Sequence, residues 1–351
     1  MSDEYLERVE TGQPVPSIDT DTTKPDRPQR SKLLLCVKVA VGVTLCAIIV
    51  ARVDWHAASR SLAATGIGLV AVMLGILIAL VFVSAYKWRL LLSIHGVEYS
   101  TLRLSRYYFV ALFFNNFLPT SIGGDGYRIY KTINNGRSKA SAIIAVVMER
   151  VTGFGTLLTL GAGAAVLLAA DAAGRLTLLG VGAASACIAA LPLAWRMRTL
   201  VPRRWRAAVP ASVRRLKATV VEHMDDYIRQ PLRSSGVIVI SIVFHVGLAF
   251  AYFVLIRYGA DQKISMLQMM SVLALTTFVA VLPISFNGLG VYEGTFIYLL
   301  AQYGVPPDVS VVPMILNRGL LIVLSLIGAG VYFLDTAGFA SRGAPRADVT
   351  H

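Results

Sequence analysis

The stretch of sequence that decides the fold is residues 67–86, IGLVAVMLGILIALVFVSAY, which contains no charged side chain. A helix of about 20 apolar residues spans the hydrocarbon core of a bilayer. Hydrophobic residues make up 56% of the 351-residue chain and charged residues only 15%, whereas soluble domains carry about 25% charged residues. The sequence therefore predicts an all-α polytopic membrane protein and excludes a soluble, disordered or collagen-like chain.

Other apolar runs bring the expected number of transmembrane helices to roughly eight. Residues 107–118 form a run too short to cross, so we expect a segment that enters and returns on one side, with a full crossing as the alternative. Residues 264–292 are apolar but interrupted by Pro283 and several glycines. The remaining candidate spans are 33–51, 140–170, 176–195, 234–256, 294–303 (which is short) and 309–334.

Basic residues lie mainly in the loops between these runs and give the chain a net charge of +13. With both termini inside, the cytoplasmic segments hold 25 Lys and Arg and the outer loops hold 5. Because cytoplasmic loops are enriched in Lys and Arg, we expect a multi-pass protein of the bacterial inner membrane with cytoplasmic termini. This placement indicates contact with anionic lipid and excludes nucleic acid as a partner.

The same reasoning divides the chain into a membrane domain and two tails. Residues 1–31 are polar and proline-containing and predict a disordered cytoplasmic tail. Residues 32–336 form the membrane domain, within which 196–233 is a basic cytoplasmic loop suited to the inner leaflet. Residues 337–351 are a short cytoplasmic tail.

Two segments of the chain resemble each other and indicate an internal repeat. Residues 117–128 read FLPTSIGGDGYR and residues 281–293 read VLPISFNGLGVYE, and they align without a gap at an offset of 164 residues. Proline and glycine clusters interrupt a helix at membrane depth, where the freed backbone must line a cavity or be buried in protein. A pair of such segments in corresponding halves points to a transporter's central site. Two tightly packed helix kinks are the structural alternative, and an inverted or parallel relation stays open.

Charged residues inside the apolar runs are the second functional signal. Glu149, Arg150, Glu293 and Arg318 each lie within a predicted span or a broken segment. An ionised side chain at the bilayer centre costs roughly 2.5–3.5 kcal/mol on insertion scales, so these groups must pair or face water. They predict either a structural salt-bridge network or a polar groove for a lipid head group. Arginine suits a phosphate because its planar guanidinium donates to two oxygens at once.

The predicted head-group site collects the broken segments and the charges near them. Arg128, Arg150 and Arg318 would hold the phosphate while Glu149 and Glu293 balance them. The other members are Asn115, Asn116, Pro119, Ser121, Gly123, Gly124, Asp125, Pro283, Ser285, Asn287, Gly288 and Gly290. The three cysteines lie in apolar runs and the five histidines lack ligand spacing. We therefore expect no metal, no cofactor and no catalytic residue.

Taken together, the motifs FFNNFLPTSIGGDGYR, VMERVTGF, LPISFNGLGVYEG and LNRG resemble the membrane domain of bacterial lysylphosphatidylglycerol synthases, also called the flippase-like family. The resemblance covers residues from about 33 to 335. Family members with an attached soluble domain make an aminoacylated lipid there and move it with the membrane domain. Without that domain in this sequence, the resemblance implies lipid translocation and no aminoacyl transfer. Tyr292 stands where many relatives have arginine, which makes the second motif less cationic.

We therefore expect a non-enzymatic lipid translocase that moves an anionic, aminoacylated or isoprenoid-linked lipid between leaflets. Its expected partners are membrane lipids and enzymes of lipid synthesis. One alternative is a non-transporting scaffold of a lipid or envelope biosynthesis complex. The other is an intramembrane lipid-modifying transferase, for which Asp125 and the acidic cluster in 222–226 are the only candidate bases.

Overall fold

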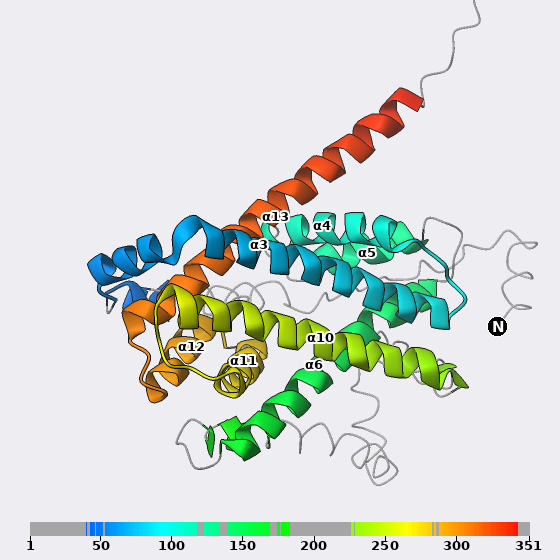
Figure 1. The fold of residues 1–351 in the computed structure, drawn as a ribbon. Coiled ribbons are helices and arrows are strands. Elements are labelled where there is room, and N and C mark those ends of the chain that lie inside the picture. The colour runs from blue at the N-terminus through cyan, green and yellow to red at the C-terminus, as the bar shows by residue number, and fades with distance from the viewer. Residues whose placement is uncertain are drawn as a thin grey trace, which may run out of the picture.

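The computed structural model describes residues 53–117, 123–133, 139–168, 229–282 and 288–342, with isolated residues in 40–51, 174–182, 226–227 and 284–285. Every element in these ranges is helical (Figure 1). The helices are α3 (Trp55–Ile94), α4 (Thr101–Phe117), α5 (Gly123–Ile133), α6 (Lys139–Leu167), α10 (Pro231–Val254), the π-helical turn η2 (Leu255–Gly259), α11 (Met266–Val281), α12 (Val291–Gln302) and α13 (Pro307–Arg342).

Four of these helices are long and apolar enough to cross a bilayer, which makes the chain a multi-pass membrane protein. They cover Thr65–Ile94, Ala140–Leu167, Pro231–Gly259 and Pro307–Asp335. The predicted spans 33–51 and 176–195 lie largely outside the described residues, as do both tails and most of the loop 196–233.

The predicted span 67–86 ends too early, because α3 continues to Ile94. Lys87 and Trp88, which lie beyond the predicted span, are therefore part of the helix, and both side chains are buried. At its other end the helix is bent at Gly66, whose φ of 68° and ψ of 147° are non-helical. Glycine adopts such a positive φ without the steric cost that a β-carbon imposes.

Helices α4 and α5 form a hairpin. At its base, the Tyr99 hydroxyl donates to the Thr132 carbonyl over 3.5 Å. At its tip, the amide of Gly124 donates to Oδ1 of Asn115 over 2.9 Å. Tyr99 follows the end of α3, so the hairpin begins and ends near that end of the long helix. The chain thus enters the bundle along α4 and returns along α5.

Helices α11 and α12 form a second hairpin. Its base is an apolar cluster that includes Ile264 and Met269 before and within α11, and Leu300 and Val305 at the end of α12. Between the helices, Gly288 and Gly290 have φ of 72° and 76°, values at which a right-handed helix cannot continue. The predicted interruption within 264–292 is confirmed: α11 ends at Val281, α12 begins at Val291, and the run 294–303 lies in the returning helix.

The two halves of the described chain form an inverted repeat, in which α3–α6 correspond to α10–α13. Helices α3 and α10 lie side by side and run in opposite directions (Figure 1). Where α10 begins, Gln230 Nε2 donates to the Ile94 carbonyl over 2.8 Å. At the opposite end, Gly259 approaches Thr65, the first residue of the spanning part of α3. The relation that the sequence left open is thus inverted, and the two hairpins enter from opposite ends.

The hairpin of each half packs against the other half. Helix α4 packs along α13, where Asn116 Nδ2 donates to the Leu321 carbonyl over 3.3 Å and to the Ser325 hydroxyl. Helix α11 packs in the equivalent way along α6, where the rings of Phe154 and Phe278 lie 6.4 Å apart. Each hairpin therefore contacts the last long helix of the other half.

Candidate functional site

A cluster of charged side chains lies between α5, α6 and α3, near the tip of the α4–α5 hairpin. At its centre is Arg128 of α5, whose side chain is only 3% exposed. Its guanidinium lies over two aromatic rings, 4.2 Å from the centroid of Trp88 and 4.1 Å from that of Tyr108. It forms ion pairs with Glu149 and, over 3.4 Å, with Asp125. Two carboxylates and two ring faces together offset the cost of burying this cation.

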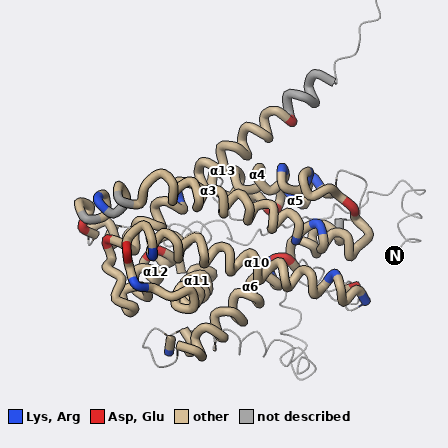
Figure 2. Tube along the Cα trace, in the orientation of Figure 1, with Lys and Arg blue, Asp and Glu red and all other residues tan. Residues whose placement is uncertain are grey.

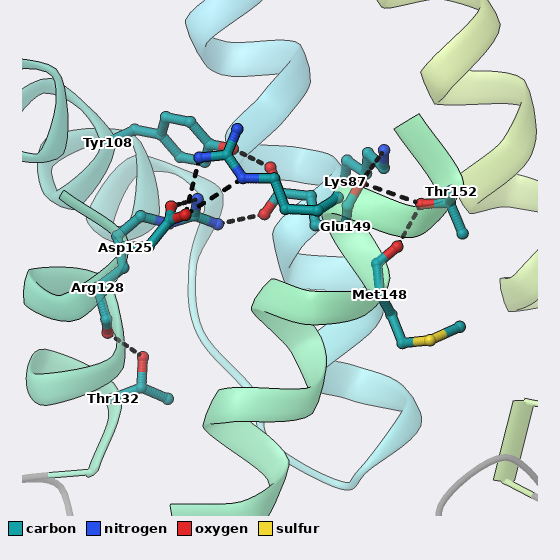
Figure 3. A network of polar contacts seen from close by, with 9 residues as sticks. Lys87, Tyr108, Asp125, Arg128, Thr132, Met148, Glu149 and Thr152 are labelled. Carbon is teal, nitrogen blue, oxygen red and sulfur yellow. Dashed lines mark hydrogen bonds and ion pairs between the residues drawn. The ribbon is translucent and has the colours of Figure 1, made fainter. Parts of the chain in front are cut away.

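Glu149 of α6 joins this cluster to two further helices (Figure 3). Its carboxylate accepts hydrogen bonds from Nη2 of Arg128 and from the Tyr108 hydroxyl on α4. Its main-chain carbonyl accepts from Nζ of Lys87 on α3 over 3.1 Å. One turn later on α6, a β-carbon at Gly153 would lie 3.3 Å from that ammonium nitrogen, so a residue without a side chain leaves room for the lysine.

Arg150 differs from Arg128 because it is paired but accessible. Its Nη2 and Nε lie 2.8 and 3.2 Å from Oδ2 of Asp125. Its side chain is nevertheless 64% exposed. Asp125 lies in the first turn of α5, where the partial positive charge of a helix N-terminus favours a carboxylate. Arg150 is therefore held in position while its outer face can contact a ligand.

These side chains line a cavity of about 490 Å³. The charged residues of its wall are three cations and two carboxylates, which leaves one positive charge in excess. The lining residues are Lys87, Arg128, Arg150, Asp125 and Glu149, with Val83, Ser84, Tyr108, Ala111, Leu112, Asn115, Gly153, Phe154, Leu157, Phe244, His245, Thr277 and Val281. We call this the central cavity.

An apolar cavity of about 260 Å³ adjoins the central cavity. The two have Ser84, Tyr108, Leu112 and Phe244 in common. Three further lining residues, Tyr252, Tyr292 and Asn317, carry polar groups. The rest of the wall is apolar and consists of Leu77, Leu80, Val81, Leu248, Leu321 and Leu324. The charged wall of the central cavity and the apolar wall of this second cavity thus lie next to each other inside the bundle.

Glu293 and Arg318 form a second, separate ion pair. Nη2 of Arg318 lies 2.9 Å from Oε1 of Glu293, whose other oxygen accepts from the amide of Gly290 over 2.8 Å. Neither residue lines the central cavity. The predicted single site with three arginines is therefore divided in two, because the hairpins that carry the acids enter from opposite ends. Glu293 and Arg318 are 25 residues apart, as are Asp125 and Arg150, so they are the equivalent pair of the other half.

Most of the remaining predicted residues that the structure describes determine the backbone conformation and packing of the hairpins. A β-carbon on Gly124 would lie 2.7 Å from Oδ1 of Asn115, so this close approach requires glycine. Gly123 begins α5, and Gly288 and Gly290 supply the positive φ angles of the second turn. Asn116 binds α13, and Ser285 is buried. Pro119, Ser121, Pro283 and Asn287 lie outside the described residues.

Sequence reasoning missed several residues of the central cavity. Lys87 and Trp88 follow an uncharged run directly, and only a longer helix would have placed them inside. Tyr108 and His245 are single polar residues in apolar segments, which carry no pattern of their own. His245 Nδ1 is buried without a hydrogen-bond partner. In the described part of the chain, no three His, Cys, Asp or Glu side chains gather as ligands for a metal ion.

Comparison with known proteins places the chain in a family. No individually curated protein matches it significantly. The sequence profile described as the lysylphosphatidylglycerol synthase TM region matches residues 35–328, which is most of the chain and includes both hairpins and both arginine–carboxylate pairs. The chain therefore belongs to the family of lysylphosphatidylglycerol synthase transmembrane regions.

Proposed function

We propose that this protein translocates a lipid with a phosphate-bearing, anionic head group between the leaflets of the bacterial inner membrane. The observation that carries the proposal is the central cavity, where an accessible arginine is held in place beside a buried charge network. The one positive charge in excess matches the single negative charge of a phosphodiester. Arg150 would bind two phosphate oxygens with its planar guanidinium.

The adjoining apolar cavity supports a lipid in preference to a soluble anion. A soluble phosphate needs only the charged wall, whereas a lipid also brings a hydrocarbon region that must be kept from water. The shared residues Tyr108 and Phe244 provide a surface at which the two parts of such a molecule would meet. Anionic phospholipids, aminoacylated lipids and isoprenoid-linked lipids all combine these two parts.

The inverted repeat supports transport. In transporters with inverted repeats, the site lies near the bilayer midplane between the halves, and movement of one half exposes it to either side. Here the tips of two hairpins from opposite ends lie at corresponding positions of the two halves. The proposal gives the chain no catalytic step.

Both termini would be cytoplasmic, since the loops rich in Lys and Arg then lie inside. Enzymes of lipid synthesis would supply the substrate.

Leaflet exchange in proteoliposomes tests this function. Purified protein is reconstituted with head-group-labelled lipids of one class at a time, and the label in the outer leaflet is bleached with an impermeant reductant. The series is run with and without a pH gradient. We expect the protected fraction to fall for one lipid class with the wild type, and the rate to fall about 10- to 100-fold for Arg150→Gln, which loses a charge-assisted contact.

A matched control removes an arginine far from the cavity. Arg60→Gln lies in the first part of α3, before the bend at Gly66, and should exchange lipid at the wild-type rate. Unchanged exchange in Arg150→Gln would refute the site. Full protection of every lipid class under both gradient conditions would refute translocation and leave the scaffold as the better account.

A further inference from the structure

A second basic site lies at the end of α3, away from the central cavity. There α3, the start of α4 and the start of α10 enclose a cleft of about 570 Å³. Its wall carries three arginines and one carboxylate, an excess of two positive charges. The lining residues are Arg89, Arg103, Arg233, Glu98, Tyr86, Leu90, Ser93, Tyr99 and Ser100. We call this the arginine cleft, and it shares no lining residue with the central cavity.

Two of the three arginines in this cleft are held by hydrogen bonds. Nη1 of Arg233 donates to the Ser93 carbonyl over 2.7 Å and to Oε1 of Gln230 over 2.9 Å. Nη1 of Arg89 lies 3.4 Å from the Thr101 hydroxyl. In the ranges that the structure describes, none of the three arginines forms an ion pair with a carboxylate. Guanidinium groups gathered in this way favour an anion that can accept from several of them.

An apolar groove of about 370 Å³ continues from the arginine cleft along α3 and α10. It is lined by Phe82, Val83, Tyr86, Thr101, Ile240 and Val243, and Tyr86 belongs to both the cleft and the groove. Phe82 is 39% exposed and Val243 is 51% exposed. Both helices are of membrane-spanning length, so these exposed apolar side chains face hydrocarbon.

The charge distribution decides which leaflet the cleft faces. Figure 2 shows few charged residues along the middle of α3 and α10, and Lys and Arg near the end where α3 stops and α10 starts. Under the positive-inside rule this end is cytoplasmic. The cytoplasmic leaflet is also the one whose anionic lipids attract basic clusters.

We propose that the arginine cleft and its groove form a binding site for one anionic glycerophospholipid of the cytoplasmic leaflet. Its phosphate accepts hydrogen bonds from Arg89, Arg103 and Arg233. One acyl chain lies in the groove against Phe82 and Val243. The arginine cleft is separate from the central cavity, with which the groove shares only Val83, and the proposal does not depend on the translocation proposed above.

Native mass spectrometry of the purified protein released from micelles tests the site, with dioleoylphosphatidylglycerol as the probe. The triple variant Arg89→Gln/Arg103→Gln/Arg233→Gln should bind it about 100-fold more weakly, at about fivefold per basic residue near a membrane surface. The matched control Arg60→Gln/Arg175→Gln/Arg257→Gln removes three charges elsewhere and should bind as the wild type does. Arg150→Gln should leave the binding event at the arginine cleft unchanged and weaken only a second one, in the central cavity, and the number of lipids bound in the mass spectrum distinguishes the two.

Two further arms identify the ligand. Dioleoylphosphatidylcholine should bind weakly, and inorganic phosphate should not compete, because it cannot occupy the groove. Val243→Trp fills the groove at an exposed position and should weaken binding even if the triple variant fails to fold. Unchanged phosphatidylglycerol binding in either the triple variant or Val243→Trp would overturn the proposal. Full competition by inorganic phosphate would also overturn it, by showing a simple anion site.

Discussion

Replacing the buried Arg128–Glu149 pair by the residues that the other half carries tests the structure at its centre. Adding 168 to the numbers of Asp125 and Arg150 gives Glu293 and Arg318, and the same offset takes Arg128 and Glu149 to Phe296 and Asn317. The second half therefore carries a phenylalanine and an asparagine where the first half carries an ion pair. The double variant Arg128→Phe/Glu149→Asn makes the two halves alike at this point.

The contacts set the expected magnitude. Arg128→Phe alone leaves Glu149 without its cation at 12% exposure, and breaking a buried pair costs about 3–5 kcal/mol. Asp125 keeps a cationic partner in this variant, because Nη2 of Arg150 remains 2.8 Å from its carboxylate. The double variant removes both charges of the pair, keeps the main-chain carbonyl that accepts from Lys87, and should lose only about 1–2 kcal/mol, mainly the contacts of the guanidinium with the two rings. The interaction energy between the two substitutions should be at least about 2 kcal/mol.

Reversible unfolding in mixed micelles with increasing dodecyl sulfate, followed by tryptophan fluorescence, gives these free energies. Arg150→Gln is the control, since an exposed ion pair contributes about 1 kcal/mol or less. The reasoning is refuted if the double variant is as unstable as the sum of the two single variants, because the charges would then not act as a pair.

Three other predictions follow from the packing. Gly124→Ala places a methyl group against α4 and should cost about 1–3 kcal/mol in the same assay, whereas Gly126→Ala, with open space around it, should cost much less. Asn116→Ala breaks the bonds to α13 and should cost about 0.6–1.7 kcal/mol, the range measured for such interhelical bonds; no change would show that the amide faces lipid. Thr65→Cys with Gly259→Cys, in a cysteine-free background, should cross-link on oxidation because these positions touch; absence of the link on gels would contradict the antiparallel packing of α3 and α10.

The apolar runs predicted most of the helices because each uncharged stretch has only one way to satisfy its backbone in a bilayer. The helix ends were harder to predict. A lysine directly after residue 86 marks the water boundary in composition alone, yet Lys87 stays inside because its ammonium group donates a hydrogen bond to the Glu149 carbonyl. That partner is 62 residues away in the chain, so no local pattern could reveal it.

The sequence singles out the charged residues of the candidate site other than Lys87, but not how they are grouped. Proline, glycine and buried charge identify Asp125, Arg128, Glu149, Arg150, Glu293 and Arg318 correctly as unusual. Which of them meet depends on the direction of each hairpin. The gapless offset of 164 aligns the glycines, whereas the ion pairs correspond at 168, because the segment between α11 and α12 is longer than that between α4 and α5. Only the folded chain shows this shift.

The inverted repeat has an energetic consequence if the two halves interchange their conformations. If the halves were identical, the two arrangements obtained by interchanging their conformations would be related by a two-fold rotation, would have equal free energy and would be populated evenly. The charged cluster around Arg128 exists in one half only, and Phe296 and Asn317 occupy its place in the other. This asymmetry removes the degeneracy, and a difference of about 1.4 kcal/mol already favours one state tenfold. Under the proposed translocation, these side chains would therefore contribute to the resting orientation of the protein.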